Sequence, residues 1–380
     1  MQPGIETLLE EHPDRLLNRR VGLIAHPASV DSKGIHSVDR LRNAGVNLVA
    51  LFGPEHGFTG RGGAGELVAD GREPVSGLPI RSLYGETRKP TPEMLRELDV
   101  LVFDLHDLGA RPYTYVSTLR YVMEAAAENG KAVVVADRPI PLPRVVDGPM
   151  LDPAFESFVG FVRTPVAYGM TPGETARFLR EDLGLDLDLL VAPLRGFSHD
   201  APIPSGRWIP PSPAIRSWAC AACFPATVFF EALPALDHGR GTDLAFQVIS
   251  APWLDALALA DELAAHPLPG VRIEPCAYRA EGAVYKGQDV RGLRLNATDP
   301  AAFRPVQAGV TLLAALQALY GPEAQWNAPG ARPEFFDKLM GTDTVRLALL
   351  KGAAPEKIAA GWAIGRPVFA DKRRAALLYG

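Results

Sequence analysis

Apolar and polar residues follow two different periods along the first 137 positions of the chain. Short apolar runs bounded by turn residues predict buried strands, and segments with apolar residues at helical spacing predict helices between them. Strands that alternate with helices are typical of a parallel sheet covered on both faces, so this part is predicted to be an α/β domain. The predicted strands are residues 21–25, 47–52, 100–105 and 131–136, and the predicted helices are residues 35–44 and 113–129.

The remaining chain predicts one more helix and strand of this domain and then a smaller α+β unit. Thr171 is the expected N-cap of the helix, with Pro172 at the first helical position and Glu174 completing a capping box. We place the larger domain in residues 1–250 and the smaller α+β domain in residues 251–380. The further expected elements are a helix at 171–183, a strand at 187–194, a proline-rich loop at 201–213, two strands within 227–252, a helix at 254–265, strands at 271–274 and 290–297, and helices at 305–319, 345–351 and 356–362.

Composition narrows the possible functions. The 39 basic and 44 acidic residues give a net charge of −5 without long runs of one sign, which disfavours a nucleic-acid partner. No apolar run reaches the roughly 18 residues of a membrane span, and the first twenty residues lack the apolar core of an export signal. A cytoplasmic protein without a membrane partner is therefore predicted. Three cysteines are too few for a disulfide framework, and Cys220 and Cys223 are expected to be buried thiols.

Polar residues follow three of the predicted strands at their carboxyl ends. In an open α/β sheet, ligands bind beyond the carboxyl ends of the strands, so we expect these side chains to converge on one crevice. The Gly/Pro-rich stretch of residues 57–92 is too long for an ordinary connection and predicts a binding element or a lid. The polar residues are Glu55 and His56 after the second strand, Asp104 and Asp107 at the third, and Asp137 and Arg138 at the fourth.

Two of the carboxylates suit the hydrolysis of a glycosidic bond. That reaction needs an acid to protonate the leaving oxygen and a second group to stabilise the oxocarbenium-like centre. Glu55 is the best placed acid because a rigid turn holds it partly desolvated, and His56, Asp104 or Asp107 would tune it. Glu231, after an expected strand, is the choice for the second carboxylate. The competing interpretation makes Glu55 a surface-loop acid and Glu231 an edge or interface acid.

The segment of residues 104–115 is unusually polar for a connection between a buried strand and a helix. Arg111 could bind an anionic group through its guanidinium, and Tyr113 and Tyr115 could supply stacking and hydroxyl contacts. The alternative is an internal ion pair between Asp104 and Arg111 that fastens the loop.

Neither a metal nor a nucleotide cofactor is predicted. His56, Asp104, His106, Asp107 and Asp137 resemble a metal site by residue type, but no His-x-His or His-Glu-x-x-His spacing is present. A dinucleotide fingerprint after the first strand is also missing. A metal-dependent hydrolase using the His/Asp cluster and a non-catalytic sugar-binding protein with a cleft between two domains remain alternatives.

Several motifs, in this order, resemble those of the NamZ-type exo-β-N-acetylmuramidases, over nearly the whole chain. The resemblance implies a Rossmann-like large domain, a smaller C-terminal domain and a cleft between them. It also implies release of terminal N-acetylmuramic acid from the non-reducing end of peptidoglycan fragments. The lack of an export signal in the first twenty residues suggests, as a hypothesis, a role in recycling internalised muropeptide sugars. The motifs are Phe-Gly-Pro-Glu-His-Gly-Phe at 52–58, the segments 104–115 and 137–142, Gly-Met-Thr-Pro-Gly-Glu at 169–174, Gly-Arg-Gly-Thr at 239–242, Ala-Pro-Trp at 251–253 and Phe-Asp-Lys-Leu-Met-Gly-Thr at 336–342.

By the same resemblance Glu55 is the catalytic acid/base. The lactyl carboxylate of muramic acid would give Arg111, Arg138 or Arg240 a ligand, because a bidentate guanidinium contact selects muramic acid over glucosamine. The chain departs from the family pattern in several polar loops, and a lost substrate hydrogen bond typically weakens discrimination by about 1–3 kcal/mol. The departures are Ile140, Tyr168, Ala214 and Ala232.

Overall fold

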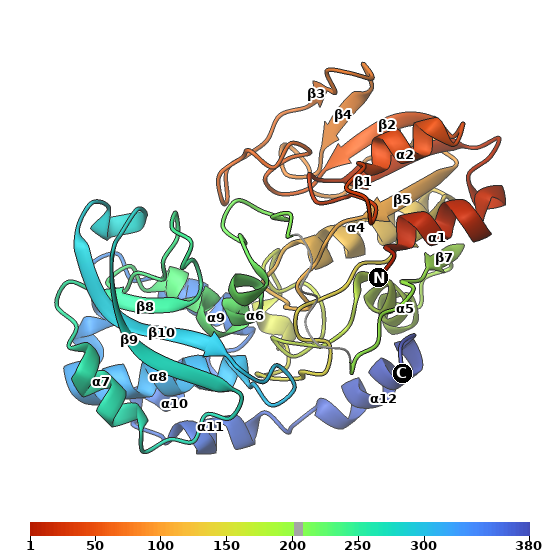
Figure 1. Ribbon diagram of the computed structural model, residues 1–380. Coiled ribbons are helices and arrows are strands. Elements are labelled where there is room, and N and C mark those ends of the chain that lie inside the picture. The colour runs from red at the N-terminus through yellow and green to blue at the C-terminus, as the bar shows by residue number, and fades with distance from the viewer. Residues whose placement is uncertain (201–207) are drawn as a thin grey trace.

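The computed structural model describes residues 1–200 and 208–380, and the chain forms two sheets (Figure 1). The expected proline-rich loop at 201–213 lies largely outside the described residues. The larger sheet has seven strands in the order β3-β4-β2-β1-β5-β6-β7, and the smaller has three in the order β8-β10-β9. The mixed α/β class with a second, smaller sheet domain is confirmed.

The seven-stranded sheet is parallel except for β3, which pairs antiparallel with β4. Strands β1, β2, β5 and β6 confirm the four runs predicted from the sequence, while β3 and β4 lie within the long 57–92 stretch. The strands are β1 (Arg20–Ala25), β2 (Asn47–Gly53), β3 (Gly71–Arg72), β4 (Pro79–Ser82), β5 (Val100–Asp104), β6 (Ala132–Ala136) and β7 (Leu189–Ala192).

Helices cover both faces of this sheet. Successive residues of β5 belong to opposite faces: Val102 packs with α1 and α2, and Phe103 packs with α4 and α5. The predicted capping box at the start of α5 is present, since Thr171 Oγ1 accepts from Glu174 N and Glu174 Oε2 accepts from Thr171 N. These helices are α1 (Gly4–Glu11), α2 (Ser37–Asn43), α3 (Pro92–Leu95), α4 (Tyr115–Glu128) and α5 (Pro172–Asp182), with short 3₁₀ turns η1 (Pro13–Arg15) and η2 (Pro153–Phe155).

The second unit packs helices against the three-stranded antiparallel sheet. Its first helix, α6, contacts α8 and β10, so the chain enters this unit near residue 218, before the division predicted at residue 250. The expected strand at 228–230 is wrong, because these residues form the 3₁₀ helix η3. The elements are α6 (Trp218–Thr227), η3 (Val228–Ala232), β8 (Val248–Ala251), α7 (Ala256–Leu263), β9 (Val271–Arg279), η4 (Ala283–Tyr285), β10 (Asp289–Ala297), α8 (Pro305–Tyr320), η5 (Pro322–Ala324), α9 (Pro333–Met340), α10 (Thr344–Leu350) and α11 (Pro355–Gly361).

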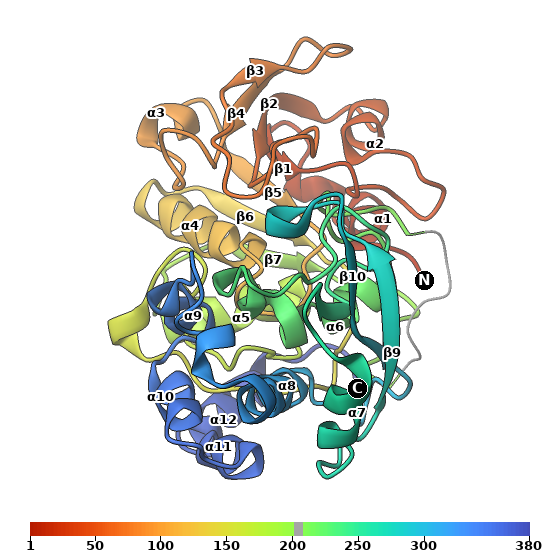
Figure 2. The same cartoon turned by 90° about the vertical axis from the view of Figure 1, so that its left-hand side faces the viewer.

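The last helix, α12 (Arg366–Ala376), returns to the first unit and packs on α5. Figure 2 shows α10, α11 and α12 together at the end of the molecule opposite β3 and β4. The segment after α12, residues 377–380, is held in place by Tyr379, whose hydroxyl donates to Asp137 Oδ2 at 2.5 Å and accepts from Leu194 N at 2.9 Å. Among the described residues, no helix has the length and apolar character needed to cross a bilayer.

Candidate active site

A cleft of about 440 Å³ lies between the two units. One wall comes from the loop after β2, the start of α4 and residues 157–159, and the other from α6, η3 and α9. In Figure 1 the helices α4, α6 and α9 occupy the region between the two sheets. Six of the predicted site residues line this cleft: Glu55, His56, Tyr113, Tyr115, Glu231 and Arg240.

Glu55 is held in the cleft wall by a tight turn and two donors. The turn is closed by a 2.8 Å bond from Gly57 N to Pro54 O, and His56 takes a positive φ of 69°. The Glu55 side chain is nearly buried, with Oε1 accepting from Gly65 N at 2.9 Å and Oε2 from Thr114 Oγ1 at 2.6 Å. The carboxyl group is therefore fixed in place, although it lies at the surface of the cleft.

The long 57–92 stretch contributes two cleft residues that the sequence analysis missed. Tyr84 and Arg88 both line the cleft beside Glu55. Burial is the main cause that raises the pKa of the Tyr84 phenol, the nearby Glu55 carboxylate raises it further, and Arg88 opposes the shift. The phenol thus lies in the electrostatic field of both groups. The Gly-Pro-rich composition signalled a binding element here but did not single out these two side chains.

Tyr113 and Tyr115 form an aromatic part of the cleft with ring centroids 4.7 Å apart. The Tyr115 hydroxyl donates to Pro211 O at 2.6 Å, while the Tyr113 hydroxyl has no hydrogen-bond partner among the described residues. Burial raises the pKa of both phenols, so both are neutral donors at ordinary pH. The Tyr113 hydroxyl is itself buried, so it is not presented to a ligand in this structure.

Glu231 lies on η3 and is ion-paired with Arg240. Arg240 Nε lies 3.1 Å from Glu231 Oε1, and Nη2 contacts the same oxygen. His238 Nε2 is 4.0 Å from that oxygen, and burial lowers the pKa of the imidazole, which the nearby Glu231 carboxylate partly offsets. The second carboxylate of the cleft is thus paired with a guanidinium.

Asp104 and Arg138 form a buried ion pair outside the cleft, which corrects their expected roles. Arg138 Nε and Nη2 donate to Asp104 at 2.6 and 2.9 Å, and Ser37 Oγ donates to the same carboxylate. Arg138 also donates to Val30 O at 2.7 Å. Both side chains are at most 4% exposed, so neither is free to contact a sugar.

Asp137 and Asp107 are also buried away from the cleft lining, so the predicted convergence of all strand ends is wrong. Asp137 accepts hydrogen bonds from Gly173 N, Thr171 Oγ1 and the Tyr379 hydroxyl, and burial raises its pKa to about 6. Asp107 accepts from Gly109 N at 2.7 Å and from Tyr168 at 3.0 Å, and burial raises its pKa to about 7.

Arg111 is fully buried and binds main-chain carbonyls, so it neither binds an anion in the cleft nor pairs with Asp104. Its guanidinium donates to Met340 O at 2.5 Å, to Pro149 O at 3.2 Å and to Thr164 O. Burial lowers its pKa to about 9. Arg111 thereby joins the two units, since Met340 ends α9 in the second unit.

Metal-ligating residue types do not assemble into a site within the described parts of the chain. No group of three or more His, Cys, Asp or Glu side chains there could hold a metal ion. Cys220 and Cys223 are buried free thiols, as expected, and burial raises the pKa of these thiols to about 11 and 12.

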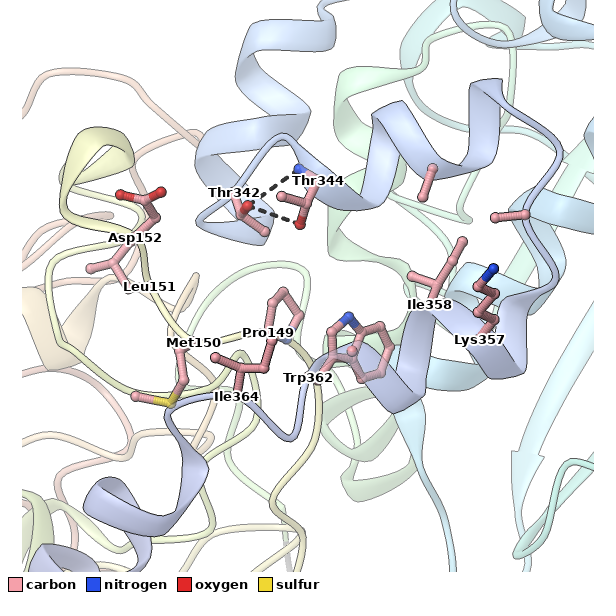
Figure 3. A pocket seen from close by; sticks show the side chains of 13 residues that line it. Pro149, Met150, Leu151, Asp152, Thr342, Thr344, Lys357, Ile358, Trp362 and Ile364 are labelled. Atoms are coloured by element: carbon pink, nitrogen blue, oxygen red, sulfur yellow. Dashed lines mark hydrogen bonds between the residues drawn. The ribbon is translucent and has the colours of Figure 1, made fainter.

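A second hollow of about 520 Å³ lies between residues 149–152 and helices α10 and α11. Figure 3 shows mostly apolar side chains around it, including Pro149, Ile358 and Trp362. Asp152, the acid in its lining, caps the η2 turn through a 2.9 Å bond from Ala154 N. This hollow lacks the paired acids of the cleft and is a poor candidate for hydrolysis.

Comparison with known proteins decides the family. The N-terminal model of the exo-β-N-acetylmuramidase NamZ matches residues 21–219, and its C-terminal model matches residues 222–379. The chain belongs to the NamZ family. A peptidoglycan β-N-acetylmuramidase NamZ of Bacillus subtilis is 35% identical over 383 residues, covering all of this chain and 91% of that relative. The NamZ family assignment makes this chain a glycoside hydrolase, and the two family models meet near the start of α6.

Two solved structures support the NamZ fold. A DUF1343 family protein from Bacteroides fragilis has a TM-score of 0.91 and 34% identity, with 100% of this chain and 99% of that chain covered. Another from the same organism has a TM-score of 0.78 and 28% identity, with coverage of 100% and 98%.

Proposed function

We propose that this protein releases terminal N-acetylmuramic acid from the non-reducing end of peptidoglycan fragments, with Glu55 as the proton donor. The observation that carries the proposal is the placement of Glu55 in the cleft between the two units, held by Gly65 and Thr114. A hollow of about 440 Å³ has the size of a small-ligand site rather than of a groove for a long polymer. Its size therefore favours attack at a chain end.

The bonds to Glu55 suit a group that must act in both protonation states. An acid/base residue gives its proton to the leaving oxygen and later takes one from water. The Thr114 hydroxyl can donate to the carboxylate or accept from the protonated acid, because its hydrogen rotates about the C–O bond. Gly65 N–H donates to the other oxygen throughout. Glu55 can thus change its protonation state without losing its position.

The second group of the reaction is Glu231 in our proposal. Arg240 Nε lies 3.1 Å from its Oε1, and a carboxylate at this place can stabilise the developing positive charge of the sugar or activate water. Assistance by the acetamido group of the substrate would make Glu231 a positioning residue instead. Tyr113, which lines the cleft, would contact the sugar ring.

Product analysis with a defined disaccharide tests this proposal. The protein is incubated with N-acetylmuramic acid β-linked to N-acetylglucosamine, and the released sugars are separated by chromatography. Equal amounts of the two monosaccharides are expected, also after exhaustive chelation. Binding without release would identify a sugar-binding protein, and activity that chelation abolishes would identify a metal-dependent hydrolase; either result would overturn the proposal.

A further inference from the structure

Four cationic side chains line the cleft. Two of them bind Glu231, and a third has no partner that would hold its side chain in one orientation. Arg240 is paired with Glu231, and Arg332 donates to the main-chain oxygen of Glu231 at 2.7 Å. Lys338 has no polar partner among the described residues, but its exposed ammonium is held by nothing that would fix its direction. The fourth cation, Arg88, is not paired with a carboxylate among the described residues and packs against two aromatic rings.

Aromatic rings hold the Arg88 guanidinium. Its central carbon lies 4.3 Å from the centroid of the Phe158 ring and 5.1 Å from that of Tyr84. No ion pair found within residues 1–200 and 208–380 includes this guanidinium, and the Tyr84 hydroxyl is a polar neighbour of it. Contact with the two rings restrains the guanidinium, and it still has N–H donors that no carboxylate of the described residues occupies.

We propose that Arg88 is the specificity-determining residue of the cleft and binds the lactyl carboxylate of the muramic acid. This inference rests on the proposed function and goes beyond it by assigning the group that distinguishes muramic acid from glucosamine. A guanidinium presents parallel N–H donors that match the two oxygens of a carboxylate. Arg111 and Arg138 are buried elsewhere, and Arg240 already holds a carboxylate. Arg88 and Glu55 both line the cleft, so the recognised anion and the proton donor are close together.

The proximity to Tyr84 gives Arg88 a second restraint. Tyr84 is 6% exposed and its ring is shared between the Arg88 contact and a packing contact with Phe158 at 5.5 Å. The proposed binding site for the carboxylate is therefore formed by Tyr84 and Arg88 of the 57–92 stretch together with Phe158. A ligand carboxylate there would be attracted by the Arg88 guanidinium.

The test compares two chromogenic substrates, a β-linked N-acetylmuramide and its lactyl methyl ester, which lacks the negative charge. The wild-type protein is expected to prefer the acid over the ester in kcat/KM by about 10- to 100-fold, the range of a hydrogen-bonded charge contact. Arg88→Gln should remove most of this preference through KM, and Arg88→Lys should restore part of it. Arg42→Gln, which removes an exposed cation on α2 outside the cleft, is the matched control and should keep the preference.

The outcomes separate the inference from the proposed function. An unchanged acid preference in Arg88→Gln would overturn the inference, and so would a loss of preference in Lys338→Met together with its retention in Arg88→Gln. A wild-type protein that releases no sugar from either substrate would overturn the proposed function itself. Melting temperatures of all variants should match the wild type, because the substituted side chains are exposed.

Discussion

The hydroxyl of Thr114 donates a 2.6 Å hydrogen bond to the carboxylate of Glu55, across 59 positions of sequence. Thr114 is the residue before α4, and Glu55 follows β2, which is two strands away from β5 in the sheet. The bond therefore fixes the proposed acid relative to Tyr113 and Tyr115, which flank Thr114 and line the same cleft.

Thr114→Val should reduce turnover of the β-muramide by about 10- to 100-fold, because it removes a hydrogen bond to a charged group while keeping the side-chain shape. Thr114→Ser keeps the hydroxyl and should restore most of the activity. Comparison of kcat and KM for both variants measures the effect. Equal losses in the valine and serine variants would show that packing of the methyl group, not the hydrogen bond, is what matters.

Glu55→Gln should lower kcat by at least about 100-fold, since an amide cannot give a proton to the leaving oxygen. The amide retains an oxygen for Gly65 N–H, so the melting temperature should change little. Glu93→Gln, at an exposed acid on α3, is the control and should behave as the wild type. Turnover of Glu55→Gln at the wild-type rate would refute the assignment.

Asp107→Asn should change the dependence of stability on pH. Burial raises the pKa of Asp107 to about 7 from the model-compound value of 3.8, so the folded state binds more protons than the unfolded state between these pH values. The stability that the neutral acid contributes is complete below about pH 4 and is lost as the pH rises through 7. The free energy of unfolding of the asparagine variant, relative to wild type, should thus rise by at least about 1 kcal/mol from pH 4 to pH 8 in denaturant titrations. A constant difference would contradict a neutral Asp107.

Arg111→Met should destabilise the protein by at least about 3 kcal/mol, because Pro149 O and Met340 O lose their donor and Thr164 O keeps only its bond from Leu151 N. Chemical unfolding of the variant measures the loss. If the variant instead kept wild-type stability and only its KM for the muramide rose, Arg111 would contact the substrate after all.

Gly341→Ala should be destabilising for two reasons. Gly341 has φ of 73°, which strains an L side chain, and an ideal Cβ there would lie 2.3 Å from Arg111 Nη2. Gly352→Ala is a matched control, with φ of 70° and no atom within 4 Å of its ideal Cβ. The melting temperature should fall further for Gly341→Ala than for Gly352→Ala, and an equal fall would show that the contact with Arg111 adds nothing.

The large sheet could be predicted because β1, β5 and β6 are buried on both faces and therefore appear as unbroken apolar runs. Helix α6 could not be predicted, because it packs against both α8 and β10 and shows no polar face. The apolar residues that follow it, Val228 to Phe230, suggested a strand for the same reason: a short buried apolar run has no period that separates strand from helix.

The proposed acid could be predicted from its turn, but the partners of the charged residues could not. Asp104 and Arg111 are seven positions apart, yet Asp104 pairs with Arg138 on the neighbouring strand end. Arg88 could not be identified from the sequence because its environment is made by Phe158, 70 positions further along. Ion pairs of this kind depend on which strands become neighbours in the sheet. The spacing of residues along the sequence does not show this.

The bonds of Arg111 to Pro149, Thr164 and Met340 also constrain how the cleft can behave. Met340 follows Lys338 and Leu339 of the opposite wall, so a hinge motion that separated the walls would leave the Met340 carbonyl without the Arg111 donor. The sugar thus binds in a cleft whose shape is already formed in the folded protein. Little conformational entropy is then lost from the walls when the ligand binds, and steric fit at the entrance decides which chain ends are accepted.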